Sequence, residues 1–277
     1  MQGPVAVVTG VSSGIGNATA RALAAGGYRV FGTARSGTSA LPAQVERVLL
    51  DVRDSASIEA GVREVLAKTG RIDLLVNNAG GSMVGAVEET SVEQGRELFD
   101  LNFFGAVRMT QAVLPAMRAR KSGRIVFISS VVGFMPAPFM GFYAASKHAL
   151  EGLAESLDHE TRALGIRAVL VEPGFTRTNI GNNRMIAAAA VDDYAAARDR
   201  AGENLRTLVT GGDDPRVVAE AVLEAATAEK PRLRYTAGKR AGVLSRLRRY
   251  LPASVFDSGL RKQFRLDSTG ATRAPVA

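Results

Sequence analysis

The segment Thr9-Gly10-Val11-Ser12-Ser13-Gly14-Ile15-Gly16 decides the fold of this chain. It follows a short apolar run and precedes an Ala-rich stretch of helical character. A glycine-rich turn between a first strand and a first helix lets the backbone approach a pyrophosphate, and the helix start offers free N–H donors. A serine at this place can also act as a helix cap. The segment predicts a dinucleotide-binding turn, whose contacts are Gly10, Ser12, Ser13, Gly14, Ile15 and Gly16.

Further short runs of Val, Ile and Leu alternate with longer stretches of helical character. The predicted strands are residues 5–9, 29–34, 45–50, 72–77, 124–129 and 167–171, with a last strand at 233–236. Strands that are apolar on both faces and joined by crossover helices form a parallel sheet covered on both sides. The prediction is an α/β protein: a single-domain, doubly wound parallel sheet (Rossmann fold) with helices on both faces. In such sheets, ligands bind beyond the carboxyl ends of the strands.

The composition excludes several kinds of chemistry. The 277 residues include no Cys and only two His, His148 and His159, so disulfides, thiolate nucleophiles and His-rich metal centres are not expected. We therefore predict no metal. The chain shows neither a secretory leader nor an apolar run long enough to span a bilayer, which predicts a cytoplasmic protein.

The positive charge is concentrated near the C-terminus. The net charge is +8, and residues 228–277 contain twelve Lys or Arg against three Asp or Glu. A basic surface can attract nucleic acid or anionic lipid. Because the excess lies outside the part that carries the motifs, no nucleic-acid partner is predicted.

Arg35 follows the second predicted strand, about twenty residues after the glycine turn. A dinucleotide fold that prefers NAD usually has an acidic residue there for the ribose 2′-hydroxyl. A guanidinium can instead form two hydrogen bonds to a 2′-phosphate and stack on adenine. The sequence favours NADP(H) over NAD(H), although Arg35 could also be a solvated surface charge.

Tyr143 and Lys147 are four residues apart and share one face of a predicted helix. A free phenol has a pKa of about 10, so acid–base work near neutral pH requires a neighbouring cation. We expect Lys147, together with a cofactor's positive charge, to lower the pKa of Tyr143. Ser130 ends the fifth predicted strand, thirteen residues before Tyr143.

With these motifs the chain resembles the short-chain dehydrogenase/reductase family from about Val5 to Gly238. The Tyr-x-x-x-Lys pair, the serine thirteen residues upstream and the glycine turn are its signature. Further family motifs are Asp51-Val52, Asn77-Asn78-Ala79-Gly80 and Pro173-Gly174-Phe175-Thr176-Arg177-Thr178. The Ser130-Val131-Val132-Gly133 turn and Glu172 are similar to the steroid- and retinoid-handling, NADP-preferring branch.

The resemblance implies roles for single residues. Tyr143 would exchange the proton, Ser130 would hydrogen-bond the substrate oxygen, and Lys147 would also bind the nicotinamide ribose. Asn102 would hold a water in a proton relay to Lys147. The other implied cofactor contacts are Asp51 and Val52, Asn77, Asn78, Ala79 and Gly80 on the adenosine side, Pro173 and Gly174, and Thr176 and Thr178 at the carboxamide.

Structural alternatives remain open for three of these residues. Asn102 could satisfy a backbone carbonyl inside a helix, the pair Asn77-Asn78 could simply end a strand, and Ser129 rather than Ser130 could face the substrate. His148 adjoins Lys147 but should point to another helix face, where a packing role is expected.

The substrate side of the chain is predicted to be apolar. Phe134, Met135, Pro136, Pro138, Phe139, Met140 and Phe142 crowd the stretch before Tyr143, which favours a sizeable hydrophobic ketone or alcohol. We predict a catalytic domain over residues 1–238 with a substrate lid at about 179–214, in which Asn179, Asn182 and Asn183 fall. Residues 239–277 form a basic extension with an amphipathic helix, which caps the pocket or carries a partner surface in preference to lying on a membrane.

The reaction that follows is hydride transfer between NADP(H) and a ketone or secondary alcohol. Nucleotide-sugar epimerases share Tyr-x-x-x-Lys but generally have another glycine spacing and a larger substrate domain. A non-catalytic NADP(H)-sensing regulator is the alternative from another class, and the complete set Asn102, Ser130, Tyr143 and Lys147 favours the enzyme. The resemblance also implies a homodimer or homotetramer.

Overall fold

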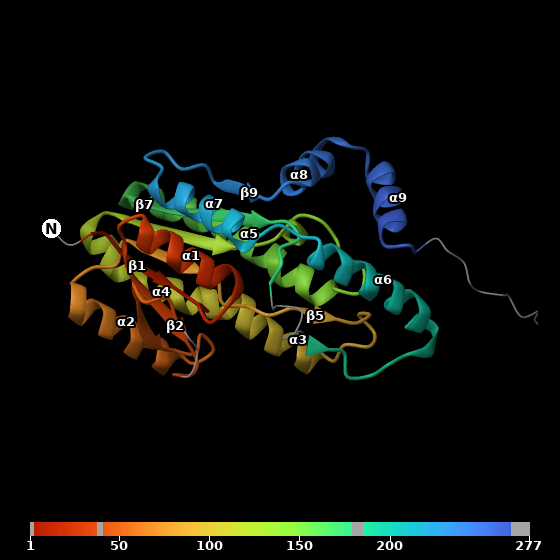
Figure 1. Cartoon of the computed structure of the whole chain (residues 1–277), viewed down its shortest axis with the longest axis horizontal. Helices are drawn as coiled ribbons and strands as arrows, with labels where there is room; N and C mark the ends of the chain where they lie inside the picture. The colour runs from red at the N-terminus through yellow and green to blue at the C-terminus, as the bar shows by residue number, and fades with distance from the viewer. Residues whose placement is uncertain (1–2, 38–40, 179–184, 267–277) are drawn as a thin grey trace, which may run out of the picture.

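A seven-stranded parallel sheet forms the centre of the molecule (Figure 1). The computed structural model describes residues 3–37, 41–178 and 185–266. The strand order is β3-β2-β1-β4-β6-β7-β9. The strands are β1 (Val5–Val8), β2 (Arg29–Ala34), β3 (Val45–Leu49), β4 (Leu74–Asn77), β6 (Gly123–Ile128), β7 (Ile166–Pro173) and β9 (Arg234–Ala237). The order runs outward in opposite directions from β1 and β4, so the predicted doubly wound α/β fold is confirmed.

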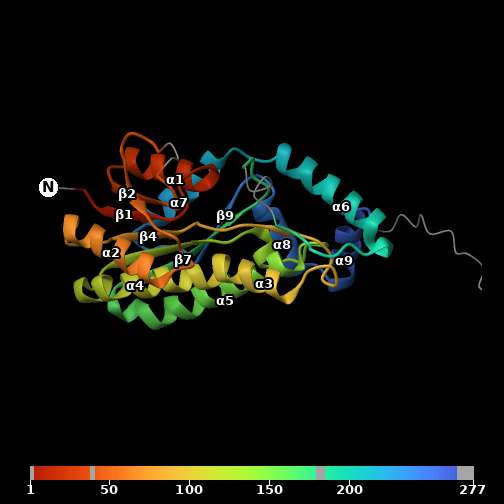
Figure 2. The ribbon, with the colours of Figure 1, turned by 90° about the horizontal axis from the view of Figure 1, so that it is seen from below.

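Helices cover both faces of the sheet, as the turned view shows (Figure 2). One face packs on α1 (Gly14–Ala25) and α7 (Pro215–Thr227). The other packs on α2 (Ser55–Thr69), α4 (Gly105–Arg120) and α5 (Gly141–Thr161). Alternate residues of β1 enter the two cores, since Val5 and Val7 face α2, α4 and α5, whereas Ala6 and Val8 face α1 and α7. This alternation explains why the strands are apolar on both faces.

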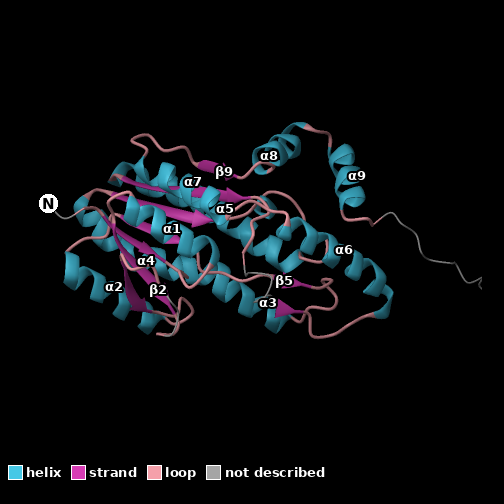
Figure 3. Cartoon of the chain, viewed as in Figure 1, coloured by secondary structure: helices cyan, strands magenta, loops and turns pink. Residues whose placement is uncertain are grey.

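The remaining elements lie mostly beyond the carboxyl end of the sheet (Figure 3). A two-stranded parallel sheet pairs β5 (Met83–Val84) with β8 (Met185–Ile186). Along the chain, α6 (Asp192–Thr210) follows β8, whereas α8 (Ala241–Tyr250) and α9 (Ala253–Gln263) follow β9. The other helical segments are α3 (Val92–Phe99), the π-helix η1 (Asp100–Phe104) and the short turns η2 (Val131–Gly133) and η3 (Arg162–Leu164).

The predicted lid and basic extension are only partly described. Asn179, Asn182 and Asn183 lie outside the described residues, as does the end of the chain from residue 267. The described part of the lid is β8, α6 and the turn before α7. In the extension, Phe256, Leu260 and Phe264 from α9 and its C-terminal end join a third apolar cluster with Val131, Val132, Met135 and Met140.

Candidate active site

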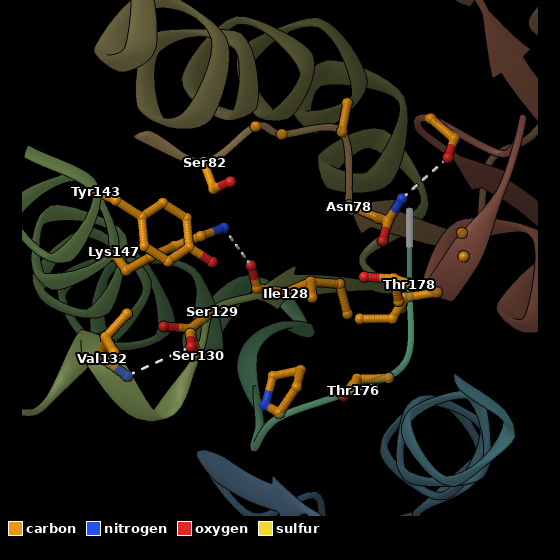
Figure 4. Close-up of a pocket in the computed structure, with 18 of the residues that line it drawn as sticks. Asn78, Ser82, Ile128, Ser129, Ser130, Val132, Tyr143, Lys147, Thr176 and Thr178 are labelled. Carbon is orange, nitrogen blue, oxygen red and sulfur yellow. Dashed lines mark hydrogen bonds between the residues drawn. The ribbon is translucent and has the colours of Figure 1, made fainter. Parts of the chain in front are cut away.

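A cavity of about 550 Å³ opens at the carboxyl ends of the central strands (Figure 4). Its wall is formed by the segments that follow β1, β2, β3, β4 and β6, by the end of β7, and by residues of α6 and Phe264. The predicted cofactor and catalytic residues line this cavity with two exceptions. Asn77 and Asn102 are not on its wall. The topology therefore brings together residues that are far apart in the sequence.

The glycine turn forms one end of the cavity. Gly14 begins α1 with a φ of +57°, a left-handed conformation that favours glycine. At Gly16 a Cβ atom would lie 2.3 Å from the Gly10 carbonyl oxygen, so a side chain has no room there. Ser13 is the N-cap of α1, but its side chain makes no capping hydrogen bond. The helix-cap interpretation of Ser13 is therefore wrong, and its hydroxyl lies on the cavity wall.

Asn78 holds this turn against the end of β4. Its side-chain nitrogen donates hydrogen bonds of 2.8 Å and 3.1 Å to the carbonyls of Thr9 and Gly10. The Thr9 hydroxyl in turn accepts from the backbone nitrogens of Asn78 and Ala79. Asn77 points the other way and donates to Thr110 at 3.1 Å. The expectation that Asn77 lines the adenosine side is wrong, because alternation along β4 turns its side chain into the core.

Arg35, Asp51 and Val52 form the rim beyond β2 and β3. Arg35 is exposed on the cavity wall. Asp51 is paired with Arg53 at 2.6 Å, and the pKa of its carboxyl is lowered by that hydrogen bond and, to a smaller degree, by the charge of Arg35. Because Arg53 neutralises Asp51, the guanidinium of Arg35 gives this end of the cavity a positive character.

Tyr143 and Ser130 face each other at the opposite end of the cavity (Figure 4). The Ser130 hydroxyl accepts a hydrogen bond from the backbone nitrogen of Val132 at 3.3 Å, which leaves its own proton free to donate. Burial raises the pKa of the Tyr143 phenol to about 12, and the hydrogen bond with Ser130 opposes that rise. At neutral pH the phenol therefore carries its proton.

Lys147 lies one helical turn after Tyr143 and is buried. Its ammonium donates a 2.9 Å hydrogen bond to the carbonyl oxygen of Ile128 and lies 5.9 Å from the centre of the Tyr143 ring. Burial lowers the pKa of Lys147 to about 8, while the charge of Glu151 acts in the opposite direction. The expectation that Lys147 lowers the pKa of Tyr143 is not met in the protein alone, because loss of solvent dominates at both groups.

Asn102 lies in η1, where the backbone N–H of Gly105 bonds to the carbonyl five residues back, at Asp100. Such single π-turns are frequent at functional sites. Its side chain accepts from the backbone nitrogen of Gly81 at 2.8 Å and donates to the Gly81 carbonyl and to the Ser146 hydroxyl. The side chain is thus an interior polar group that holds Gly81 in the cavity wall and contacts α5, the alternative left open by the sequence.

The end of β7 closes the third side of the cavity. Pro173 and Gly174 end the strand, and the Gly174 backbone nitrogen donates to the Ala237 carbonyl at 2.9 Å. The Thr176 hydroxyl donates to the Gly174 carbonyl at 3.3 Å. Thr178 lies beside Gly14, because a Cβ atom there would be 3.3 Å from the Thr178 side chain. This segment therefore lines the cavity from the end of β7 to the glycine turn.

Apolar side chains line much of the cavity near Tyr143, but only some of the residues predicted for the substrate side are among them. Met135 and Met140 line the cavity, whereas Phe142 packs on Gly95 and the Phe139 ring stacks edge-on with Tyr194. Leu205, Arg206, Val209 and Thr210 of α6 also line the cavity and fall within the predicted lid, and Phe264 lies in the predicted extension, although the sequence did not single out any of these residues. The four-residue spacing of Phe256, Leu260 and Phe264 is the signal that could have identified the last of these.

His148 is next to Lys147 in the sequence, and Ser129 is next to Ser130. His148 does point away from the cavity, but it is exposed and its Nδ1 contacts the Ala144 carbonyl at 2.9 Å, so the predicted packing role is wrong. Ser129 is buried, and its hydroxyl lies toward Gly133 and Glu151 and has no hydrogen-bond partner among the described residues. Ser130, not Ser129, is the serine that lowers the pKa of the Tyr143 phenol.

Residues 4–187 match the model of the short chain dehydrogenase family. The chain belongs to that family. Members of this family are oxidoreductases, so the chain is an oxidoreductase. Its fold, its glycine turn and its Tyr143–Lys147 pair are the features that the sequence predicts.

Individual relatives match this short-chain dehydrogenase over nearly its whole length. The 3-ketodihydrosphingosine reductase of Bacteroides thetaiotaomicron is 35% identical over 264 residues, which are 94% of this chain and 98% of that protein. A crystal structure of a short-chain dehydrogenase from Streptomyces avermitilis has a TM-score of 0.81 at 38% identity and covers 97% of this chain and 99% of its own. An alcohol dehydrogenase from Thermococcus sibiricus, complexed with 5-hydroxy-NADP, has a TM-score of 0.68 at 26% identity and covers 85% and 96%.

Proposed function

We propose that this short-chain dehydrogenase uses NADP(H) to interconvert an apolar ketone and its secondary alcohol, with Tyr143 as the general acid and base. The arrangement that carries the proposal is a single cavity with the glycine turn at one end and Tyr143, Ser130 and Lys147 at the other. A donor bound along the turn and an acceptor in the apolar half would meet at these three side chains. The family membership supports the same reaction type.

The protein's own features fit a nicotinamide dinucleotide. The start of α1, with the uncapped Ser13 and glycines at positions 14 and 16, suits a pyrophosphate. Arg35 would bind a 2′-phosphate, Asp51 to Val52 and Asn78 to Gly80 would bind the adenosine part, and Pro173 to Thr178 would bind the nicotinamide part. When bound, the cofactor supplies or accepts the hydride. The complex of the Thermococcus sibiricus relative with 5-hydroxy-NADP supports the choice of phosphate form.

The proton comes from the chain itself. During reduction the Tyr143 phenol, protonated at neutral pH, donates to the carbonyl oxygen, and Ser130 donates a second hydrogen bond to the same atom. Lys147, one helical turn after Tyr143, supplies a positive charge that stabilises the Tyr143 phenolate left after proton transfer. Asn102 acts as a positioning residue, because it fixes Gly81 and Ser146 on two sides of the site.

The substrate class follows from the apolar half of the cavity. Met135, Met140, Leu205, Val209 and Phe264 offer carbon surface next to the catalytic hydroxyls. Such a wall favours a ketone on an extended apolar group over a small polar sugar. The relative named 3-ketodihydrosphingosine reductase supports a ketone on a long alkyl chain.

The test is turnover across a carbonyl panel. We expect the purified full chain to oxidise NADPH with long-chain apolar ketones, more slowly with NADH, and least with aldoses. Cofactor binding without turnover on any ketone would instead favour the non-catalytic NADP(H)-sensing regulator. Preference for aldoses would contradict the apolar-substrate assignment while leaving the reaction type in place.

Domain organisation and assembly complete the proposal. Residues 1–238 would form the catalytic unit with the lid at about 179–214, and residues 239–277 an extension whose described helices cap the apolar half of the cavity. A cytoplasmic location and a homodimer or homotetramer remain predictions, which fractionation and the solution mass of the full chain would test.

A further inference from the structure

Helix α8 has two apolar stripes, and within residues 3–37, 41–178 and 185–266 only one of them is covered. Ala241 and Leu244 pack into the cluster that closes the substrate end of the cavity. Val243, Leu247 and Tyr250 follow the spacing of another helix face and are 48%, 40% and 75% exposed. An amphipathic helix on a globular core needs one apolar stripe, so the second stripe is available to an external partner.

The exposed apolar surface continues across the turn into α9. Residues 246–255 are all exposed, and they include Leu251 and Val255. We call Val243, Leu247, Tyr250, Leu251 and Val255 the outer patch. Eleven large hydrophobic residues are exposed in the described parts of the chain, and five of them belong to this patch. The patch lies on α8 and the start of α9, at one edge of the molecule, where α8 adjoins the end of β9 (Figure 1).

Positive charge surrounds the outer patch. Residues 239–266 contain eight Lys or Arg and one acid, Asp257. Arg240, Arg246 and Arg249 are exposed, and within the described part of the chain none of them has an ion-pair partner. Arg249 instead lies over the Tyr250 ring at 5.9 Å. Arg248 is also exposed, and its guanidinium contacts the Phe134 carbonyl and the Phe256 ring.

We propose that the outer patch docks the protein onto an anionic lipid bilayer. Apolar side chains beside arginines are the arrangement by which an amphipathic helix lies in the membrane interface, and an exposed tyrosine is suited to the headgroup level. Each basic residue near an anionic leaflet adds to the attraction. Helix α9 caps the cavity with its inner face, while α8 and the turn keep a second face exposed among the described residues, so docking on a membrane is favoured over a partner surface.

A second copy of the chain is a poorer occupant of the outer patch. In a two-fold symmetric dimer the same surface faces itself. Eight Lys or Arg from each copy would then lie against the same surface of the other, with Asp257 as the one acid that each copy's residues 239–266 contribute, which is unfavourable. An anionic bilayer offers both the opposite charge and the apolar interior.

The position of the outer patch suits the proposed substrate. The same two helices place Leu244, Phe256, Leu260 and Phe264 in the cluster that borders the apolar half of the cavity. A docked molecule would hold this half close to the bilayer, where ketones with long apolar chains reside. This last step rests on the proposed function, whereas the docking itself does not. No helix in the described ranges is long and apolar enough to cross a membrane.

Vesicle sedimentation of the full chain tests the docking without any substrate. Vesicles of phosphatidylcholine alone are compared with vesicles that also contain phosphatidylserine, at low and high salt. We expect binding to the anionic vesicles that weakens as salt screens the charges. The variants Arg246→Glu with Arg249→Glu, and Leu247→Ser with Tyr250→Ser, should each lower the apparent affinity by at least about tenfold. All four side chains are exposed, so the fold should be retained.

The control pair is Arg63→Glu with Arg118→Glu, two exposed arginines on α2 and α4. It makes the same change in net charge away from the outer patch and should bind the anionic vesicles like the parent. Reduction of a short, water-soluble ketone by each variant confirms that the catalytic site is intact. Equal vesicle binding by parent and patch variants overturns the proposal. Absence of parent binding to anionic vesicles also overturns it and would favour an acidic protein as the partner. A dimer that dissociates in the patch variants overturns it as well, because it would assign the surface to a second copy of the chain.

Discussion

The ammonium of Lys147 donates a 2.9 Å hydrogen bond to the carbonyl oxygen of Ile128, nineteen residues earlier in the chain. This bond ties α5 to the end of β6. Ser130 follows Ile128 by two residues and Tyr143 precedes Lys147 by one helical turn, so a single contact places the two hydroxyls on the same side of the cavity (Figure 4). The lysine therefore has a structural role in the site in addition to its charge.

Replacing Tyr143 with Phe should separate chemistry from binding. The ring and its packing remain, but the proton donor is lost, so turnover with a ketone should fall by at least about a hundredfold. NADPH affinity, measured by fluorescence, should change little. Tyr28→Phe is the matched control because Tyr28 lies before β2, at the opposite end of the sheet. Residual activity within a few-fold of the parent would assign the proton to another group.

The pH profile should report Lys147. Because its pKa is about 8, the side chain is charged below that pH and neutral above it. The value of kcat/KM for NADPH, which reflects the free enzyme, should therefore fall as the pH rises through about 8. In Lys147→Arg the guanidinium stays charged, so this decline should disappear even if the remaining rate is low. If kcat/KM for NADPH in that variant still falls near pH 8, a group other than residue 147 titrates.

Arg35 should control the choice of cofactor. In Arg35→Ala, KM for NADPH should rise by about tenfold to a hundredfold, the range for hydrogen bonds to charged groups, while KM for NADH stays close to the parent value. The exposed Arg63 on α2 serves as control, since Arg63→Ala removes a charge far from the rim. Equal losses for NADPH and NADH in Arg35→Ala would show that Arg35 does not recognise the 2′-phosphate.

The layered fold was predictable from local patterns. Runs such as 29–34 are apolar on both faces, and only a parallel sheet covered by helices satisfies that pattern. The π-turn around Asn102 was not predictable, because its extra residue is imposed by tertiary bonds to Gly81 and Ser146 rather than by local preference. The contribution of Phe264 was missed for a related reason, since its place in the cavity depends on how α8 and α9 fold back.

That Ser130, Tyr143 and Lys147 line one cavity was predictable, but the electrostatics of these residues were not. The spacing of Tyr143 and Lys147 indicates a shared helix face and says nothing of how much water reaches them. Burial raises the pKa of the phenol and lowers that of the amine, the opposite of what a simple ion pair would produce. Likewise, Glu172 was noted only as a motif residue, although it belongs to a buried ionic cluster.

That cluster lies behind the site and should make stability depend on pH. Arg234 from β9 binds Glu151 and Glu172, both buried, and reaches Glu155 at 2.6 Å. Burial and the neighbouring charge of Glu151 raise the pKa of Glu172 to about 7 from its ordinary value of 4.5. The folded protein therefore keeps this proton to higher pH than the unfolded chain, and stability should decrease as the pH rises from about 4.5 to 7.

Glu172→Gln should remove that dependence, because glutamine keeps an oxygen for Arg234 and cannot ionise. Relative to the parent, its free energy of unfolding should increase by about 1 to 3 kcal/mol between the two ends of this pH range, as measured by urea denaturation. The exposed Glu224, paired with Arg232 at 2.7 Å, is the control, and Glu224→Gln should change the pH dependence by less than about 0.5 kcal/mol. If the difference in the free energy of unfolding between Glu172→Gln and the parent stays constant with pH, Glu172 is ionised over the whole range. In that case the charge of Arg234, and not a bound proton, offsets the repulsion between Glu151 and Glu172.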